Sequence, residues 1–138
     1  MRYLGLDLGS RTLGIAVSDP SGIIASNYKV IRHQEEYDEL IFKVKEIVEE
    51  LKIEGIVLGF PKNMNNTVGD RGLTTLQFKD KLWEWFGLEV IMQDERLTTV
   101  EATNYLLEAD MSRKKRKKKI DKIAANIILQ TYLDRRKD

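Results

Sequence analysis

The stretch LGLDLGSRTLGIAVSD, residues 4–19, contains two apolar segments separated by the turn-forming residues GSRT. Residues 2–8 (RYLGLDL) predict a buried strand, and residues 13–18 (LGIAVS) predict a second one. The proline and glycine of DPSG, residues 19–22, favour another turn, which leads to a third strand within IIASNYKVIR, residues 23–32. Three strands joined by short turns predict an antiparallel meander.

After the meander, helical and strand patterns alternate. Apolar residues recur at the three-and-four spacing of an amphipathic helix from Tyr37 to Leu51. This order predicts an α/β or α+β architecture, with a mixed sheet whose later strands are parallel and flanked by helices. The remaining elements are predicted as a strand at 54–60, a helix containing Leu82, Trp85 and Phe86, a strand at 88–93, a helix that starts with the Thr98 and Glu101 capping box and continues through YLLEA, and a last helix from about 120 to 134.

The composition favours one soluble domain, residues 1–138. Hydrophobic residues make up 42% of the chain and charged residues 33%, so the chain can bury a core and is not compositionally disordered. Cysteine is absent, which excludes disulfides and thiolate chemistry. Asp7 interrupts the N-terminal apolar run, and no later run approaches the length that spans a membrane. We therefore expect a cytoplasmic protein without a membrane partner.

Seven consecutive cations form a segment from 113 to 119, which we call the basic segment. The chain has 23 Lys and Arg and 22 Asp and Glu, so outside the basic segment 16 cations face 22 acids, a net charge of −6. Like charges repel one another unless a polyanion neutralises them, and nucleic acid is the commonest polyanion. The alternative is a solvated loop or helix end without a ligand. The basic segment consists of Arg113, Lys114, Lys115, Arg116, Lys117, Lys118 and Lys119.

Three acids occupy positions of special interest. Asp7 lies in an otherwise apolar strand pattern, where an ionised carboxylate is costly unless it is paired or bound to a metal. Glu95 follows the strand at 88–93, and strand alternation sends Glu95 and Asp94 to opposite faces, so only one of them joins Asp7. Asp121 is in the first turn of the last predicted helix, where the helix dipole favours the ionised form.

Each acid also has an ordinary structural explanation. Asp7 can cap the following turn, and Asp121 can serve only to satisfy the helix dipole. Asp94 and Glu95 can form a surface ion pair with Arg96. Together, however, acids from two strand ends and a helix start can converge on one edge of a mixed sheet. Carboxylates without His or Cys suit Mg²⁺ or Mn²⁺, and one or two such ions can activate a water for phosphodiester hydrolysis.

Four segments resemble, in order, the motifs of the YqgF family, which is also called RuvX and described as Holliday junction resolvases. They are LGLDLGSRTLGIAVSD, IVLGFPKNMNNTVGDRG, DERLTTVEA and SRKKRKKKIDKIAANIILQTYLD, and they cover nearly the whole chain. The resemblance implies a ribonuclease H-like fold and metal-dependent hydrolysis of nucleic acid phosphodiesters. The family is associated with maturation of the small-subunit ribosomal RNA precursor and, by older inference, with resolving DNA junctions. The implied partners are structured RNA such as pre-rRNA, branched DNA and the pre-ribosomal particle.

By this resemblance, the catalytic and metal-binding carboxylates are Asp7, Glu95 and Asp121. Related junction resolvases carry another acid one helical turn after the last one, and this chain has Ala124 there. A fourth ligand would therefore come from Asp94 or from water.

Several polar residues near these motifs suit contacts with nucleic acid. The alternatives are a simple loop after the strand at 54–60 and ordinary solvent exposure of the arginines. His33, the only histidine, lies in a polar stretch and is predicted to be a surface residue. The residues predicted to contact nucleic acid are Arg11, Lys62, Asn63 and Arg96, together with the basic segment.

Two other functions stay open at this point. The segment DLGSRTLGIAVSD also resembles the first phosphate loop of the actin and sugar-kinase fold, although those ATPases need two such domains around the nucleotide. A non-catalytic RNA-binding assembly factor would keep the fold and the basic segment. Such a protein would gain nothing from acids that repel phosphate, so the acids favour the nuclease.

Overall fold

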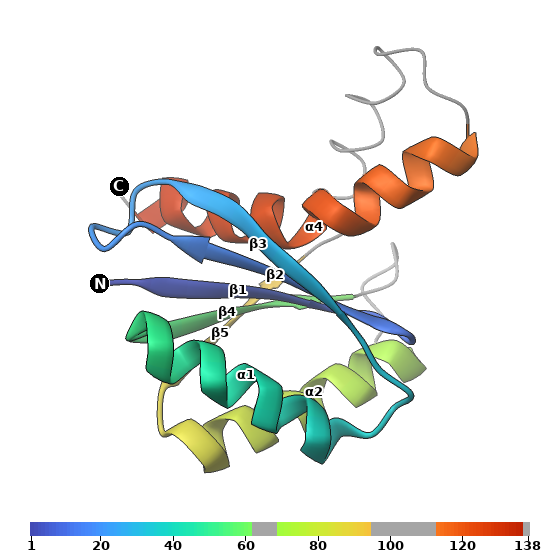
Figure 1. Ribbon diagram of the computed structural model, residues 1–138, viewed down its shortest axis with the longest axis horizontal. Coiled ribbons are helices and arrows are strands. Elements are labelled where there is room, and N and C mark those ends of the chain that lie inside the picture. The colour runs from blue at the N-terminus through green and yellow to red at the C-terminus, as the bar shows by residue number, and fades with distance from the viewer. Residues whose placement is uncertain (62–68, 95–112, 137–138) are drawn as a thin grey trace.

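The computed structural model describes residues 1–61, 69–94 and 113–136, and for residues 113–122 it describes the backbone alone. Among these residues, no helix has the length and apolar character needed to cross a membrane. The described chain forms one sheet with helices on both faces (Figure 1). Its elements are β1 (Tyr3–Leu8), β2 (Thr12–Ser18), β3 (Ala25–Arg32), α1 (Tyr37–Leu51), β4 (Gly55–Phe60), α2 (Asp70–Phe86), β5 (Glu89–Asp94) and α4 (Arg113–Arg136).

The sheet is mixed, as the sequence predicts. Its strand order is β3-β2-β1-β4-β5. The pairs β1–β2 and β2–β3 are antiparallel, which confirms the meander, and β1–β4 and β4–β5 are parallel. Leu6 lies opposite Leu58, which in turn lies opposite Met92. The three parallel strands therefore finish at the same edge of the sheet.

The two faces of the sheet bury different side chains of β1, because successive side chains of a strand point to opposite sides. Leu4, Leu6 and Leu8 belong to the core beneath α1 and α2. Tyr3 belongs to the second core, which lies beneath α4. Figure 1 shows the same arrangement, with α4 on one side of the sheet and α1 and α2 on the other. The buried residues of α1 are Leu40, Ile41, Val44 and Ile47, and those of α4 are Ala125, Ile128, Leu129 and Leu133.

Helix α4 packs closely against β1 at Gly5. A Cβ atom on Gly5 would lie 2.7 Å from the Leu129 Cβ and 3.1 Å from the Ala125 carbonyl oxygen. Further toward the start of β1, the ring of Tyr3 meets the ring of Tyr132 edge-on, with 5.5 Å between their centroids. Later residues of α4 thus meet earlier residues of β1, so the helix and the strand run in opposite directions.

Helix α4 begins earlier than the sequence predicts. The expected start was near residue 120, with the basic segment as an interruption, whereas the helix begins at Arg113 and includes the whole segment. Lys and Arg are good helix formers because their unbranched side chains lose little rotamer freedom. Repulsion between like charges costs about 0.2–0.5 kcal/mol for each pair three or four residues apart, so it offsets part of this helix propensity without preventing the helix. The helix predicted from Thr98 lies outside the described residues.

We predict that Gly5→Ala lowers the free energy of unfolding by about 1–3 kcal/mol, because the added methyl group overpacks the contact with α4. Urea denaturation followed by circular dichroism measures this change. The control is Ser26→Ala on β3, where the side chain is exposed, and its effect should stay within about 0.5 kcal/mol. Equal stability of Gly5→Ala and wild type would contradict the close packing of α4 on β1.

Candidate active site

Asp7 lies one residue before the end of β1 and is partly buried. Side chains two residues apart in a strand point to the same face, so Asp7 shares the face of Tyr3 and Gly5. That face is covered by α4. Its partner across the antiparallel pair is Gly14, which carries no side chain. The carboxylate therefore lies on the α4 face, near the edge at which the parallel strands end.

The alternation of β5 separates its last two residues. Ile91 packs against the core beneath α4, whereas Met92 packs against the core beneath α1 and α2. Gln93 therefore belongs to the α4 face, and Asp94 belongs to the opposite face. The structure thus argues against Asp94 as the substitute for a fourth ligand beside Asp7. Glu95 follows directly and lies outside the described residues.

The backbone of Asp121 lies in α4, one helical turn before Ala125. Ala125 meets Gly5 of β1, and the helix and strand run in opposite directions. One turn of helix advances about 5.4 Å, and two residues of strand advance about 6.6 Å. Extended by one helical turn and two strand residues from the Gly5 contact, this geometry predicts that the backbone of residue 121 lies over the end of β1 near Asp7. The two acids predicted from the first strand and the last helix lie on the same side of the sheet.

The residues on this face fit a hard cation as far as the structure describes them. A carboxylate oxygen is the ligand type that Mg²⁺ and Mn²⁺ prefer. Within the described ranges, no group of three His, Cys, Asp or Glu side chains is placed to hold a metal ion. Of the three predicted ligands, Asp7 alone has a described side chain. The structure therefore describes the side chain of one predicted ligand and the backbone of a second.

The turn that follows Asp7 is held by residues from distant parts of the chain. The Arg71 guanidinium Nη2 donates a hydrogen bond to the Leu8 carbonyl at 3.2 Å. The His33 ring Nε2 bonds to the Gly9 carbonyl at 2.8 Å. The His33 backbone N–H donates to the Arg11 carbonyl at 2.9 Å. Three carbonyls of this turn thus have partners from the end of β3 and the start of α2.

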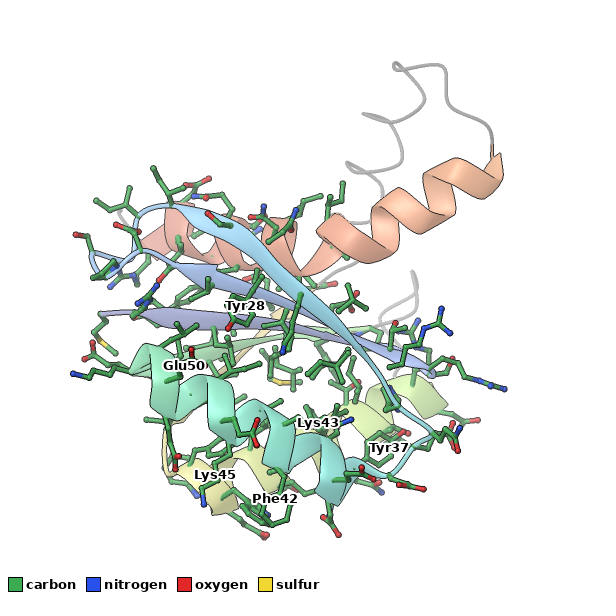
Figure 2. The ribbon with its side chains drawn as sticks, viewed as in Figure 1. Tyr28, Tyr37, Phe42, Lys43, Lys45 and Glu50 are labelled. Atoms are coloured by element: carbon green, nitrogen blue, oxygen red, sulfur yellow. The ribbon has the colours of Figure 1, made fainter. Side chains whose placement is uncertain are left out.

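His33, predicted to be a surface residue, is partly exposed and also makes structural hydrogen bonds. Its ring is partly buried and bonded at both nitrogens, because Nδ1 also accepts a hydrogen bond from the Glu35 N–H at 3.0 Å. It lies 5.8 Å from the Tyr37 ring, and Tyr37 lies 6.1 Å from Phe78, between centroids. Figure 2 shows Tyr37 at the start of α1. Burial raises the pKa of the Tyr37 hydroxyl, and the negative charge of Glu35 raises it further.

Exposed cations lie at the end of β3 beside the same turn. Arg11, a predicted nucleic acid contact, is exposed, and the next residue, Thr12, pairs with Arg32. Both arginines line a shallow cavity of about 220 Å³ together with His33. No motif in the sequence predicts that Arg32 and Arg71 lie near the candidate site. Their positions follow from the pairing of segments that are far apart in the chain. The predicted nucleic acid contacts Lys62, Asn63 and Arg96 lie outside the described residues.

The basic segment forms the first two turns of α4. Consecutive helical residues are rotated by about 100°, so seven of them surround the whole helix axis. The first turn contains no acid. Cations at a helix N-terminus oppose the helix dipole, and cations three or four residues apart repel one another. This charge pattern is unfavourable for the helix alone, and a bound polyanion would relieve it.

The sequence model of the family described as "RuvX: Holliday junction resolvase" matches residues 1–135. The chain belongs to the RuvX family. Relatives in Streptococcus pneumoniae, including strains Hungary19A-6 and CGSP14, carry the name "Putative pre-16S rRNA nuclease". They are 54% identical over 138 residues, and the match covers 99% of this chain and 99% of theirs.

Solved structures show that this RuvX-family chain has a ribonuclease H-like fold of the resolvase type. Thermus thermophilus RuvC is 14% identical, with a TM-score of 0.56 over 99% of this chain and 96% of RuvC. The fowlpox virus Holliday junction resolvase is 12% identical, with a TM-score of 0.58 over 98% of this chain and 99% of the viral one. A Thermus thermophilus hexokinase matches with a TM-score of 0.50, 21% identity and 76% of this chain, but only 39% of the hexokinase. The shared sheet explains why the first strands resemble a kinase phosphate loop.

We predict that Asp7→Asn weakens Mn²⁺ binding at least about 10-fold, whereas Asp94→Asn changes it less than about 3-fold, because Asp94 lies on the opposite face of the sheet. Isothermal titration calorimetry with Mn²⁺ measures both affinities. Thermal melting of each variant checks that it is folded. A larger loss of affinity in Asp94→Asn than in Asp7→Asn would contradict the assignment of faces.

Proposed function

We propose that this RuvX-family protein is a metal-dependent nuclease that hydrolyses phosphodiester bonds at the 5′ end of the pre-16S ribosomal RNA. The observation that carries the proposal is the crossing of α4 over β1 at Gly5. By helix and strand geometry, this crossing supports a position of Asp121 near Asp7. The name of the Streptococcus pneumoniae relatives supports the reaction and the RNA substrate. Ribosomal RNA processing places the proposed activity in the cytoplasm, on RNA that is free or within a pre-ribosomal particle.

We assign Asp7, Glu95 and Asp121 as the catalytic carboxylates. They would hold one or two Mg²⁺ or Mn²⁺ ions, which when bound supply an activated water and neutralise the charge on the leaving oxygen. Asp7 offers its carboxylate from the end of a buried strand, where its backbone pairs with Gly14 of β2 and the preceding residue, Leu6, pairs with Leu58 of β4. Water or substrate oxygens complete the coordination, because Ala124 replaces the fourth acid of related resolvases.

The substrate strand would run from the exposed arginines beside the β1–β2 turn toward the basic segment. Arg11 and Arg32 lie beyond the end of β1. Figure 1 shows the first turns of α4, which contain the basic segment, extending past the sheet on the side where β1 ends. Cations on both sides of the Asp7 edge can hold a phosphate backbone across the acids. Lys62, Asn63 and Arg96 remain predicted contacts of the same substrate.

A DNA junction is the second candidate substrate. The family description names Holliday junction resolvases, and similar folds occur in RuvC and in the fowlpox virus resolvase, each solved with a junction. The same acids and cations would serve either substrate, because hydrolysis and phosphate binding do not distinguish RNA from DNA.

We predict that wild type cleaves labelled pre-16S ribosomal RNA with Mg²⁺ or Mn²⁺, and that Asp7→Asn lowers kcat at least about 100-fold, because the reaction loses a metal ligand. A four-way DNA junction is assayed in parallel, and Asp94→Asn is the matched control. Cleavage of the DNA junction without cleavage of the RNA would make DNA the substrate of the proposed nuclease. Binding of both substrates without cleavage of either would instead support a non-catalytic assembly factor, and equal cleavage by Asp7→Asn would refute the proposed chemistry.

We predict that the double variant Lys115→Gln and Lys118→Gln binds RNA more weakly than wild type and with a smaller dependence on salt. Each lost phosphate contact lowers the slope of log K against log salt by about 0.7 for single-stranded RNA. Fluorescence anisotropy at several salt concentrations gives this slope. The control is Lys43→Gln with Lys45→Gln on α1, which removes the same charge from the other side of the sheet (Figure 2). Equal slopes in the two double variants would contradict a specific role for the basic segment.

A further inference from the structure

The backbone immediately after Asp7 is fixed from outside β1. Arg71 bonds to the Leu8 carbonyl, and His33 bonds to the carbonyls of Gly9 and Arg11. A carboxylate that binds a metal must be held close to its productive position, and the hydrogen bonds of the surrounding residues provide that precision. The residues that restrain this turn therefore restrain the end of the strand that carries Asp7.

We propose that Arg71 and His33 are positioning residues that orient Asp7 by clamping the turn between Leu8 and Arg11. This inference rests on the proposed function, since it concerns Asp7 as a metal ligand. Neither side chain would touch the substrate or the metal. Their effect would pass through the backbone of the turn.

Both clamping residues are themselves anchored. The His33 ring is held at both nitrogens, since Nε2 bonds to the Gly9 carbonyl and Nδ1 accepts from the Glu35 N–H. Glu35 has a φ of 63°, an unusual value for a residue other than glycine, and its bond to Nδ1 helps to hold that conformation. Because Nδ1 accepts, Nε2 carries the proton and donates to Gly9.

Arg71 is anchored through the first turns of α2. The Thr75 hydroxyl donates to the Arg71 carbonyl at 2.8 Å, and Thr75 is 1% exposed. Three residues further along α2, Phe78 is also 1% exposed and meets the Tyr37 ring, which in turn meets His33. The two clamping residues are therefore tied to one another through the core beneath α1 and α2.

A direct contact of Arg71 with substrate phosphate is the competing explanation, because the residue as a whole is exposed. The surroundings disfavour it. Arg71 lines a cavity of about 200 Å³ together with Glu35 and Asp70. Two carboxylates beside one guanidinium would repel a phosphate. The bond to the Leu8 carbonyl already directs the guanidinium toward the turn.

The test compares Mn²⁺ affinity, kcat and KM in Arg71→Met, Arg71→Lys, His33→Ala and His33→Gln. We expect Arg71→Met and His33→Ala to weaken Mn²⁺ binding about 10-fold, in the range found for residues that orient metal ligands. Both should lower kcat and leave the KM for nucleic acid within about 2-fold. His33→Gln should recover most of the lost affinity, because its amide can donate to the Gly9 carbonyl. The control Arg135→Met, at an exposed position near the end of α4, should behave as wild type.

Hydrogen exchange gives a readout that does not depend on activity. The Gly9 N–H donates to the Thr12 carbonyl at 2.8 Å, so it should exchange faster in Arg71→Met and His33→Ala if the turn loosens. Arg71→Lys keeps the charge but lacks the planar fork of the guanidinium. It should therefore show a smaller loss than Arg71→Met, and melting temperatures identify any variant that fails to fold.

The outcomes separate this inference from the proposed function. If wild type and Asp7→Asn bind Mn²⁺ equally, the proposed metal site is wrong. If Asp7→Asn loses Mn²⁺ but Arg71→Met and His33→Ala retain it with unchanged Gly9 exchange, the clamp is wrong while the metal site stands. A raised KM with normal Mn²⁺ affinity in Arg71→Met would make Arg71 a substrate contact and also overturn the clamp.

Discussion

The contact between α4 and Gly5 of β1 is the constraint on which the proposed site depends. A glycine at this position lets the helix lie against the strand backbone, with the Leu129 Cβ and the Ala125 carbonyl where a side chain of β1 would otherwise be. Because the helix axis is fixed there, the position of each preceding turn follows from helix geometry. This geometry predicts that the backbone of Asp121 lies near Asp7. A larger residue at position 5 would shift the helix and both acids relative to each other.

Helix α4 carries side chains of opposite charge close together. Its first two turns carry the basic segment, and Asp121 follows that segment after a single residue. Cations near the helix start would normally be destabilising, and a nucleic acid bound beside them turns this cost into binding energy. In the proposed mechanism, an acid just inside the helix would lie close to the bound phosphate backbone. One continuous helix would then provide both the cations that attract the substrate and one of the metal ligands.

Features encoded by local patterns could be predicted from the sequence. The meander follows from short strands and turn residues, and the parallel strands follow from the alternation of helices and strands; the structure confirms both. The clamp could not be predicted, because Arg71 and Leu8 are 63 positions apart and His33 and Gly9 are 24 apart. The early start of α4 was missed because charge repulsion was given more weight than helix propensity. The role of Glu95 rests on the family resemblance.

Anomalous diffraction from Mn²⁺ in crystals of the protein would show whether Asp7 and Asp121 bind the same ion. We expect a Mn²⁺ peak on the α4 face of the sheet, coordinated directly by carboxylate oxygens of Asp7 and Asp121. A Mn²⁺ ion bound elsewhere, with no carboxylate of Asp7 in its coordination shell, would rule out the proposed metal site. So would a position of α4 that holds Asp121 away from Asp7.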